Sequence, residues 1–134
     1  MLAKSRLVVQ GFKDRCLGQY RRDAPTASRL AQSMVLLVAA AEGYTLWSGD
    51  VKNGYFNGVD IQREVFVEQP RGGLPGLQRG QLLKAKKAIY GFAEAARHFW
   101  LAIRQAFEKA GFKQSRLEDA FFYKRSQGRL VAVA

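Results

Sequence analysis

The stretch that decides the fold reads SGDVKNGYFNG at residues 48–58, and EVFVEQP at 64–70 follows it closely. An aromatic, β-leaning segment at 44–50 ends at Asp50, and two Asn-Gly pairs behind it are typical of turns. A carboxylate at the end of a strand projects toward a cleft, which makes Asp50 the first candidate for chemistry. On residue type alone, such an Asp more commonly bonds nearby backbone amides. The pattern therefore predicts a strand that ends in a turn, with Asp50 at the junction.

Hydrophobic spacing on both sides of this stretch predicts the other elements. Apolar residues three and four apart indicate two helices, one from Ser28 to Gly43 and one over 92–110 that ends at Gly111. Short β-capable runs predict strands, and these are Leu7–Val9, Tyr44–Asp50, Glu64–Glu68, 120–125 and 129–134, the last two joined by a hairpin. A Gly- and Pro-rich loop lies between Arg71 and Gly80. This order predicts an α/β (α+β) fold with a mixed sheet and helices packed on one face.

The composition indicates one basic, globular domain. The chain has 134 residues, 48% of them hydrophobic, which suits a single packed core. Lys and Arg number 22 against 11 Asp and Glu, so the net charge is +11 and the isoelectric point is about 10.2. Residues 51–134 carry +8 of that charge, from 15 basic and 7 acidic side chains. A polyanion, with nucleic acid first among the candidates, is therefore the expected partner.

Several classes of site and location are excluded. One cysteine and one histidine leave no intrachain disulfide, no HExxH motif and no multi-histidine zinc site, so any metal would be held by carboxylates. The longest apolar run, Met34–Ala41, is far shorter than the roughly 20 residues that span a bilayer. We also find no secretion signal in the first residues. The expectation is an intracellular protein, cytoplasmic or nuclear, that is neither secreted nor in a membrane.

A run of cations lies after the second quoted stretch, with no acid between its first and last members. The run consists of Arg71, Arg79, Lys84, Lys86 and Lys87. Such spacing suits contact with a phosphate backbone, and that contact would be independent of base sequence. A solvated loop is an equally simple interpretation of the same run.

The segment DVKNGYFNG at 50–58 resembles a motif of the Ty1/copia-type retrotransposon reverse transcriptases, which reads close to D-V-K-T-A-F-L-N-G. Residues 64–70 are similar to that family's E-V-Y-M-x-Q-P. KSRLVVQGF at 4–12 is similar to its K-A-R-L-V-A-x-G-F, LKAKKAIYGF at 83–92 to L-x-K-x-L-Y-G-L, and GFKQS at 111–115 to G-F-x-x-S. The matches occur in order and at matching spacing over almost the whole chain. The resemblance implies a partial fingers and palm of an RNA-directed DNA polymerase.

The resemblance also implies roles for the residues around Asp50. Asp50 would be the first metal-binding carboxylate, and Val51 would lend its backbone carbonyl to the same Mg²⁺. Tyr55 would stack under the sugar of the incoming nucleotide and favour dNTP over rNTP. Ordinary aromatic packing is the alternative interpretation of Tyr55. Gly54 stands where the family commonly has alanine, a change expected to matter little.

Four further residues would contact the nucleotide by resemblance. Lys4 and Arg6 would lie on a fingers strand, where cations meet the triphosphate, unless they are only a screened surface pair. Tyr90 and Gly91 would lie at the start of the helix under the templating base pair. The expected partners are thus an RNA template, a DNA primer and dNTP, together with the remainder of the polymerase domain.

Two departures from the family pattern limit the prediction. The family reads L-K-Q-S-P-R where this chain has FAEAAR at 92–97, so a glutamate replaces the glutamine. In addition, the Y/H-V-D-D turn that carries the other two carboxylates is absent. Polymerases use two Mg²⁺ ions roughly 3.5 to 4 Å apart, and one carboxylate cannot position both. The sequence therefore predicts a polymerase fragment that is inactive by itself.

The expected organisation is a single partial domain over residues 1–134. Residues 1–45 would form a fingers-like strand, loop and helix, and 46–134 a palm-like portion with a basic loop at 70–87. Two hypotheses from other classes stay open. One is a non-catalytic basic module that binds RNA or DNA, derived from a decayed element. The other is an interaction domain whose apolar end strand pairs with another segment.

Overall fold

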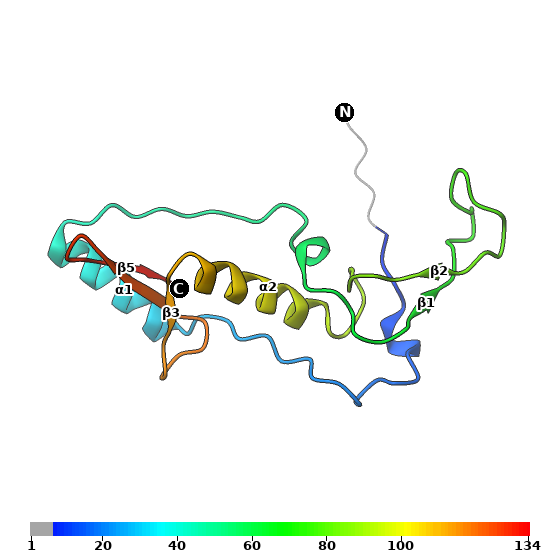
Figure 1. The fold of residues 1–134 in the computed structure, drawn as a ribbon, viewed down its shortest axis with the longest axis horizontal. Coiled ribbons are helices and arrows are strands. Elements are labelled where there is room, and N and C mark those ends of the chain that lie inside the picture. Colours follow the sequence, from blue (N-terminus) through cyan, green and yellow to red (C-terminus); the bar gives the residue numbers. More distant parts are fainter. Residues whose placement is uncertain (1–6) are drawn as a thin grey trace. The chain divides into compact units, whose positions relative to one another are not determined.

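The computed structural model describes residues 7–134, which divide into two compact units (Figure 1). The first unit contains the residues up to Asp23 together with Asn53–Phe99, and the second contains Ala24–Lys52 and Trp100–Ala134. The elements within the described residues are, in order, η1 Gly11–Lys13, α1 Arg29–Glu42, η2 Gly54–Asn57, β1 Phe66–Val67, β2 Leu83–Lys84, α2 Ala95–Lys109, β3 Lys113–Gln114, β4 Phe122–Ser126 and β5 Arg129–Val133.

The ends of α1 follow from two residues. The Ser28 side chain accepts a hydrogen bond from the Ala31 N–H at 3.1 Å, which satisfies one of the backbone donors that the first turn leaves free. Gly43 ends the helix in the left-handed conformation, at φ +64°, where a residue without Cβ is not strained. The helix predicted from Ser28 to Gly43 is confirmed.

The first unit is built around an antiparallel pair and a small apolar core. β1 pairs with β2, with Phe66 opposite Lys84, and single backbone bonds extend this pairing as far as a bridge between Asp60 and Lys87. The centre of the core comprises Ala88, Phe92 and Ala95, all of them buried. The expected strand at Glu64–Glu68 thus forms in shorter form as β1. β2 lies inside the segment 70–87 that the sequence predicted as a basic loop.

The second unit contains a three-stranded antiparallel sheet in the order β3-β4-β5. The turn between β4 and β5 places Gln127 and Gly128 at φ +50° and +77°, which matches the right-handed twist of the two strands. This hairpin was predicted, whereas β3 was not. The Phe107 ring of α2 lies 5.0 Å from the Phe122 ring of β4, centroid to centroid, so an aromatic contact links the helix to the sheet.

Two expected strands do not form. Residues 7–10 and 44–50 have no regular secondary structure. A strand is stabilised by pairing with a neighbour, and no strand of the described chain pairs with either segment. Leu46 and Trp47 are accordingly 53% and 91% exposed. The residues of 44–50 have a high β propensity, but a strand also needs a neighbouring strand to pair with, and the propensity of one segment does not supply it.

The α/β class is confirmed by the two helices and the small sheets. Within that class the strands form two separate antiparallel sheets rather than one mixed sheet, because each strand pairs with one close to it in sequence. α2 begins at Ala95, three residues later than expected, because Gly91 at φ +96° belongs to the turn before it. The division into a fingers-like and a palm-like portion stays a prediction. Over residues 7–134 no helix has the length and apolar character needed to cross a membrane.

Candidate nucleic-acid interface

Asp50 and Val51 lie in the irregular segment that leads out of the second unit, and both are exposed. A site for two Mg²⁺ ions needs more than one carboxylate. Across residues 7–134 no three Asp, Glu, His or Cys side chains come together as a metal site would require. The residues described here therefore do not fit the implied pair of ions by themselves, and Asp50 supplies one acid only. Lys4 and Arg6, the expected contacts of the triphosphate, lie outside the described residues.

Tyr55 and Tyr90 do come together in the first unit. Their ring centroids are 4.8 Å apart, and the Phe99 and Phe56 rings lie 6.2 Å from Tyr55 and 6.1 Å from Tyr90 respectively. η2 carries Tyr55 and Phe56, and the turn before α2 carries Tyr90. The structure thus brings together two residues that the sequence had marked separately as nucleotide contacts. Their role toward a nucleotide stays a prediction.

Gly54 is more constrained than the sequence comparison indicated. A Cβ atom at Gly54 would lie 2.9 Å from Cζ of Phe99 and 3.1 Å from two more atoms of that ring. Real Cβ atoms essentially never come that close, so the ring would have to move. The Phe99 ring also contacts Tyr55, which means that the displacement would reach the aromatic group. The sequence led us to expect that this change matters little, whereas the packing of Phe99 gives a physical reason to expect a larger effect.

Gly54→Ala is therefore expected to lower the free energy of unfolding by about 1 to 2 kcal/mol, the usual range for overpacking a site whose neighbour can partly move. Urea denaturation followed by circular dichroism measures the change. Gly49→Ala is the matched control, because a Cβ atom there meets nothing within 4 Å. Equal unfolding midpoints for Gly54→Ala and Gly49→Ala would contradict the predicted clash.

Gly91 forms part of a close backbone contact with the N-terminal segment. The Val9 N–H donates to the Tyr90 carbonyl at 2.8 Å, and a Cβ atom at Gly91 would lie only 1.9 Å from the Val9 carbonyl oxygen. Gly11 is buried on the other side of this contact, and its Cβ would lie 2.1 Å from the Gly91 carbonyl oxygen. Residues 9–11 and 90–91 can approach this closely only because two glycines face each other.

The five cations of the basic run divide into two kinds. Lys84 forms an ion pair with Glu64, and Lys87 donates to the Gly58 carbonyl at 2.7 Å with Asp60 at 3.8 Å. These two lysines hold the β1–β2 ribbon and the segment before it. Lys84 itself is exposed, and so are the remaining three, Arg71, Arg79 and Lys86, but these three form no ion pair with a described residue. The sequence analysis treated the run as one surface for a phosphate backbone, whereas two of its five cations pair with other residues of the first unit.

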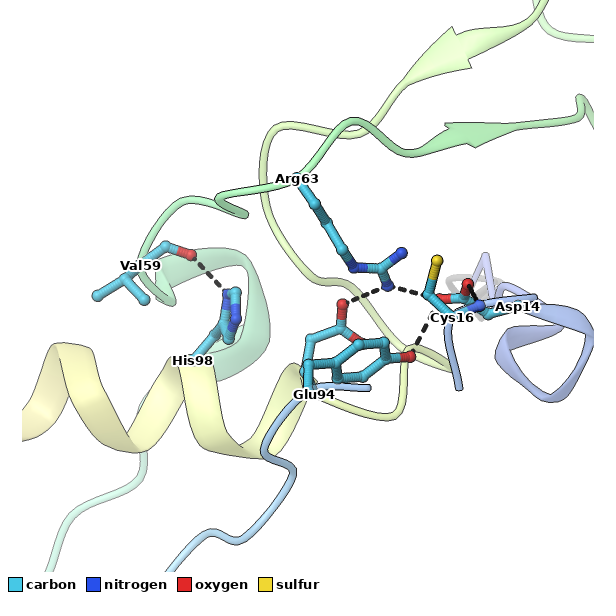
Figure 2. Close-up of polar contacts among 7 residues, drawn as sticks. Asp14, Cys16, Val59, Arg63, Glu94 and His98 are labelled. Atoms are coloured by element: carbon cyan, nitrogen blue, oxygen red, sulfur yellow. Dashed lines mark hydrogen bonds and ion pairs between the residues drawn. The ribbon is translucent and has the colours of Figure 1, made fainter. Parts of the chain in front are cut away.

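A group of charges that the sequence analysis missed ties three segments of the first unit together (Figure 2). Arg63 Nη2 donates to Asp14 Oδ2 at 2.5 Å and to Glu94 Oε1 at 2.7 Å. The Arg63 guanidinium also lies over the Tyr20 ring, 4.4 Å from its centroid, and the Tyr20 hydroxyl donates to Asp14 at 3.0 Å. Glu94 is 2% exposed, so its charge is almost fully desolvated. Its appearance in place of the family's glutamine was the one sequence signal of this group.

The electrostatics of this group follow from burial and hydrogen bonding. Burial, the hydrogen bond to Asp14 and the nearby carboxylates raise the pKa of Tyr20 to about 12. Burial alone would raise the pKa of Asp14, but the hydrogen bonds from the Cys16 N–H, Arg63 and Tyr20 outweigh it and lower that pKa. Arg63 has its pKa raised by its two carboxylate partners, against the opposing effect of burial. Near neutral pH the Tyr20 hydroxyl therefore stays neutral, the Asp14 carboxyl stays ionised and Arg63 stays protonated.

His98 fixes a further segment to α2. Its Nδ1 lies 3.1 Å from the Val59 carbonyl oxygen, and the Val59 N–H donates to the His98 carbonyl at the same distance (Figure 2). Gly58 packs against His98 so closely that a Cβ would lie 3.1 Å from its backbone. The half-buried His98 ring thereby holds the end of the segment that begins at η2.

Comparison with known proteins agrees with the motifs. The family model described as reverse transcriptase (RNA-dependent DNA polymerase) matches residues 2–134. The chain is 27% identical over 129 residues to the retrovirus-related Pol polyprotein from transposon RE2 of Arabidopsis thaliana, covering 96% of this chain and 9% of that protein. Its identity to the corresponding polyprotein from transposon TNT 1-94 of Nicotiana tabacum is 24%, covering 91% of this chain and 9% of that protein. No solved structure matches the chain. The chain thus spans about a tenth of the length of these relatives.

Proposed function

This chain belongs to the reverse transcriptase (RNA-dependent DNA polymerase) family, and we propose that it contributes the first metal-binding carboxylate and part of the nucleotide site to a domain that copies RNA into DNA. The predicted resemblance to copia-type retrotransposon reverse transcriptases is confirmed by the match over residues 2–134 and by the transposon Pol polyproteins that the chain resembles. The observation that carries the proposal is this match, which includes the stretch around Asp50.

The proposed roles within the domain follow the motifs. Asp50 would bind Mg²⁺ together with the Val51 carbonyl, and Tyr55 and Tyr90 would form the aromatic floor on which the incoming nucleotide lies. The 4.8 Å separation of the two rings supports a shared role for them. An RNA template, a DNA primer and dNTP would be the partners. Because these substrates occur inside cells, we propose an intracellular location, in the cytoplasm or the nucleus.

We further propose that the 134-residue chain alone does not polymerise. One carboxylate cannot hold the two ions of the family mechanism, and in the part of the chain that the structure describes no three Asp, Glu, His or Cys side chains gather as a metal site would require. The remainder of the polymerase domain would supply the missing acids. This proposal separates the chain's contribution, which is binding and positioning, from the activity of the whole domain.

Primer extension on poly(rA)/oligo(dT) with Mg²⁺ and dTTP tests the proposal. The chain alone is compared with a chimera in which it replaces the matching segment of the transposon RE2 polyprotein, and with the unexchanged RE2 protein as reference. We expect synthesis by the chimera and none by the chain alone. The chimera should lose synthesis when it carries Asp50→Asn, while Glu42→Gln, the same carboxylate-to-amide change at an exposed acid outside every quoted motif, should retain it.

Two outcomes would contradict the proposal. A folded chimera that binds primer and template but makes no DNA, beside an active reference, would reject the polymerase role and favour a non-catalytic binding module. Undiminished synthesis by the Asp50→Asn chimera would reject the assignment of Asp50. Gel filtration and circular dichroism of each protein confirm that a negative result does not come from unfolding.

A further inference from the structure

The segment between β1 and β2 folds into a loop that encloses an open pocket of about 330 Å³. Arg71 and Arg79 come from opposite sides of this loop in the sequence, and both line the pocket. Neither arginine makes an ion pair or a hydrogen bond with any described residue, in contrast to Lys84 and Lys87 nearby. Two guanidinium groups that share a pocket without a partner repel each other, so an anion between them would be stabilised.

The loop is held in shape by one side chain. Gln69 Nε2 donates to the Gln78 carbonyl at 2.7 Å and to the Gln81 carbonyl at 3.0 Å, and Gln69 Oε1 accepts from the Leu74 N–H at 3.1 Å. A single amide thereby bridges the start, the middle and the end of the loop. Glycines at positive φ make the reversals between these points, and they are Gly73, Gly76 and Gly80. A pocket that is already ordered loses less entropy when a ligand binds.

The chemistry of the pocket identifies its ligand. Arginine presents planar donors that match the oxygens of a phosphate group, and it does so better than the point charge of lysine. Glu68 also lines the pocket, so the net charge of its ionisable lining is +1 rather than +2. That single acid opposes a compact, highly charged anion more than it opposes a phosphodiester, which carries one negative charge per phosphate. The pocket is also open, which lets a strand pass through it.

We propose that the β1–β2 loop, residues 68–82, is a contact site for the phosphate backbone of a nucleic-acid strand, with Arg71 and Arg79 donating to phosphodiester oxygens and Gln69 holding the loop ready. The inference rests on the proposed function for the identity of the strand, which would be the template or the primer. It goes beyond that function because it assigns the contact to Arg71 and Arg79 alone rather than to the whole basic run, and it assigns to Gln69 the role of holding the loop in shape. Such contacts position a strand without reading its bases.

Fluorescence anisotropy of a labelled 20-nucleotide RNA, titrated with the 134-residue chain at several salt concentrations, tests the inference. For single strands the slope of log K against log salt is about −0.7 per phosphate neutralised, so the double variant Arg71→Ala/Arg79→Ala should lose about 1.4 from the magnitude of the slope. We expect its affinity to fall about tenfold near 0.1 M salt. Both side chains are exposed and without partners in the described chain, so the fold should be unaffected.

The matched control removes two other exposed arginines from the β4–β5 hairpin. Arg125→Ala/Arg129→Ala changes the net charge by the same amount but leaves the loop intact. An equal loss of slope in this control would show that only net charge matters and would overturn the inference. An unchanged slope in the Arg71→Ala/Arg79→Ala variant would overturn it as well.

Three further variants sharpen the test. Glu68→Gln should tighten binding about two- to threefold, because it removes the only acid of the lining. Gln69→Ala should weaken binding while keeping most of the slope, since it loosens the loop but leaves both cations. The double variant Arg71→Lys/Arg79→Lys should keep the slope and lose part of the affinity. Weaker binding of RNA by Glu68→Gln would contradict the proposed ligand.

A competition experiment separates a strand from a free nucleotide. Unlabelled RNA should displace the labelled strand from the wild-type chain, and 1 mM dTTP should not. Displacement by dTTP that disappears in the Arg71→Ala/Arg79→Ala variant would assign the pocket to a triphosphate and overturn the inference. None of these measurements depends on polymerisation, so an inactive chimera rejects the proposed function alone, and an unchanged salt slope rejects this inference alone.

Discussion

Gly91→Ala is expected to destabilise the first unit by more than about 4 kcal/mol, enough to unfold it under ordinary conditions. The added Cβ atom would lie 1.9 Å from the Val9 carbonyl oxygen and 2.8 Å from Val9 C and N, all of them backbone atoms that no side-chain rotation can move. Gly91 also has φ +96°, a conformation that costs an L-residue about 1 to 3 kcal/mol on its own. Small domains are stable by only about 5 to 15 kcal/mol, so the combined loss is decisive.

The loss should be local at first. The contact joins residues 9–11 to the turn before α2, and the Val9 N–H bond to the Tyr90 carbonyl is the link that would break. Hydrogen exchange followed by mass spectrometry should therefore show faster exchange in peptides from 60–90, with 113–133 less affected. Gly72→Ala is the control, because a Cβ atom there meets nothing within 4 Å. Protection in Gly91→Ala equal to that in the control would contradict the close contact.

The sequence predicted those elements whose signals are local. Ser28 and Gly43 mark the ends of α1 by capping chemistry that acts within one helical turn. The hairpin of β4 and β5 needs only a turn with a suitable glycine between two short runs. Periodicity placed α2 within three residues of its observed start. In each case the residues that determine the structure lie next to one another in the chain.

The predictions failed where structure depends on distant segments. Tyr44–Asp50 has the composition of a strand, yet a strand must pair with a neighbouring strand, and the hydrophobic pattern does not identify which segment that would be. Gly91 could be recognised as a motif residue, but its reason, the approach of the Val9 backbone, joins positions 82 residues apart. Lys84 and Lys87 were grouped with the free arginines because the acids that pair with them, Glu64 and Asp60, precede the run. Charge alone did not distinguish a structural cation from an available one.

The candidate site shows the same difference between features set by neighbouring residues and features set by distant ones. Tyr55 and Tyr90 belong to motifs that lie 35 residues apart; the family resemblance marked each as a nucleotide contact, but it did not predict that their rings lie side by side. Gln69 belongs to a matched motif as well, and the structure gives a reason for an amide there, since it bonds three points of the β1–β2 loop. Arg63 carried no signal at all. Its importance comes from Asp14 and Glu94, which lie 49 and 31 residues away.

Arg63→Met is expected to lower the free energy of unfolding by about 3 to 4 kcal/mol. Removing one partner of a buried ion pair leaves the other charge without compensation, which typically costs 3 to 5 kcal/mol. Glu94 is the charge at risk, because it is 2% exposed and its Oε2 already has no hydrogen-bond partner in the described chain. Asp14 is less buried and keeps its bonds from the Cys16 N–H and Tyr20, so its contribution should be smaller.

A double variant distinguishes the loss of the charge pair from the loss of packing over the Tyr20 ring. Arg63→Met/Glu94→Gln removes the buried charge and restores the amide of the family pattern, so it should regain at least half of the lost free energy of unfolding. Arg104→Met is the control, since its pair with Glu108 is exposed on α2 and should contribute less than about 0.5 kcal/mol. Urea denaturation measures the free energy of unfolding of each variant. If the double variant is no more stable than Arg63→Met, the buried charge is not what Arg63 compensates, and its packing over Tyr20 is the larger contribution.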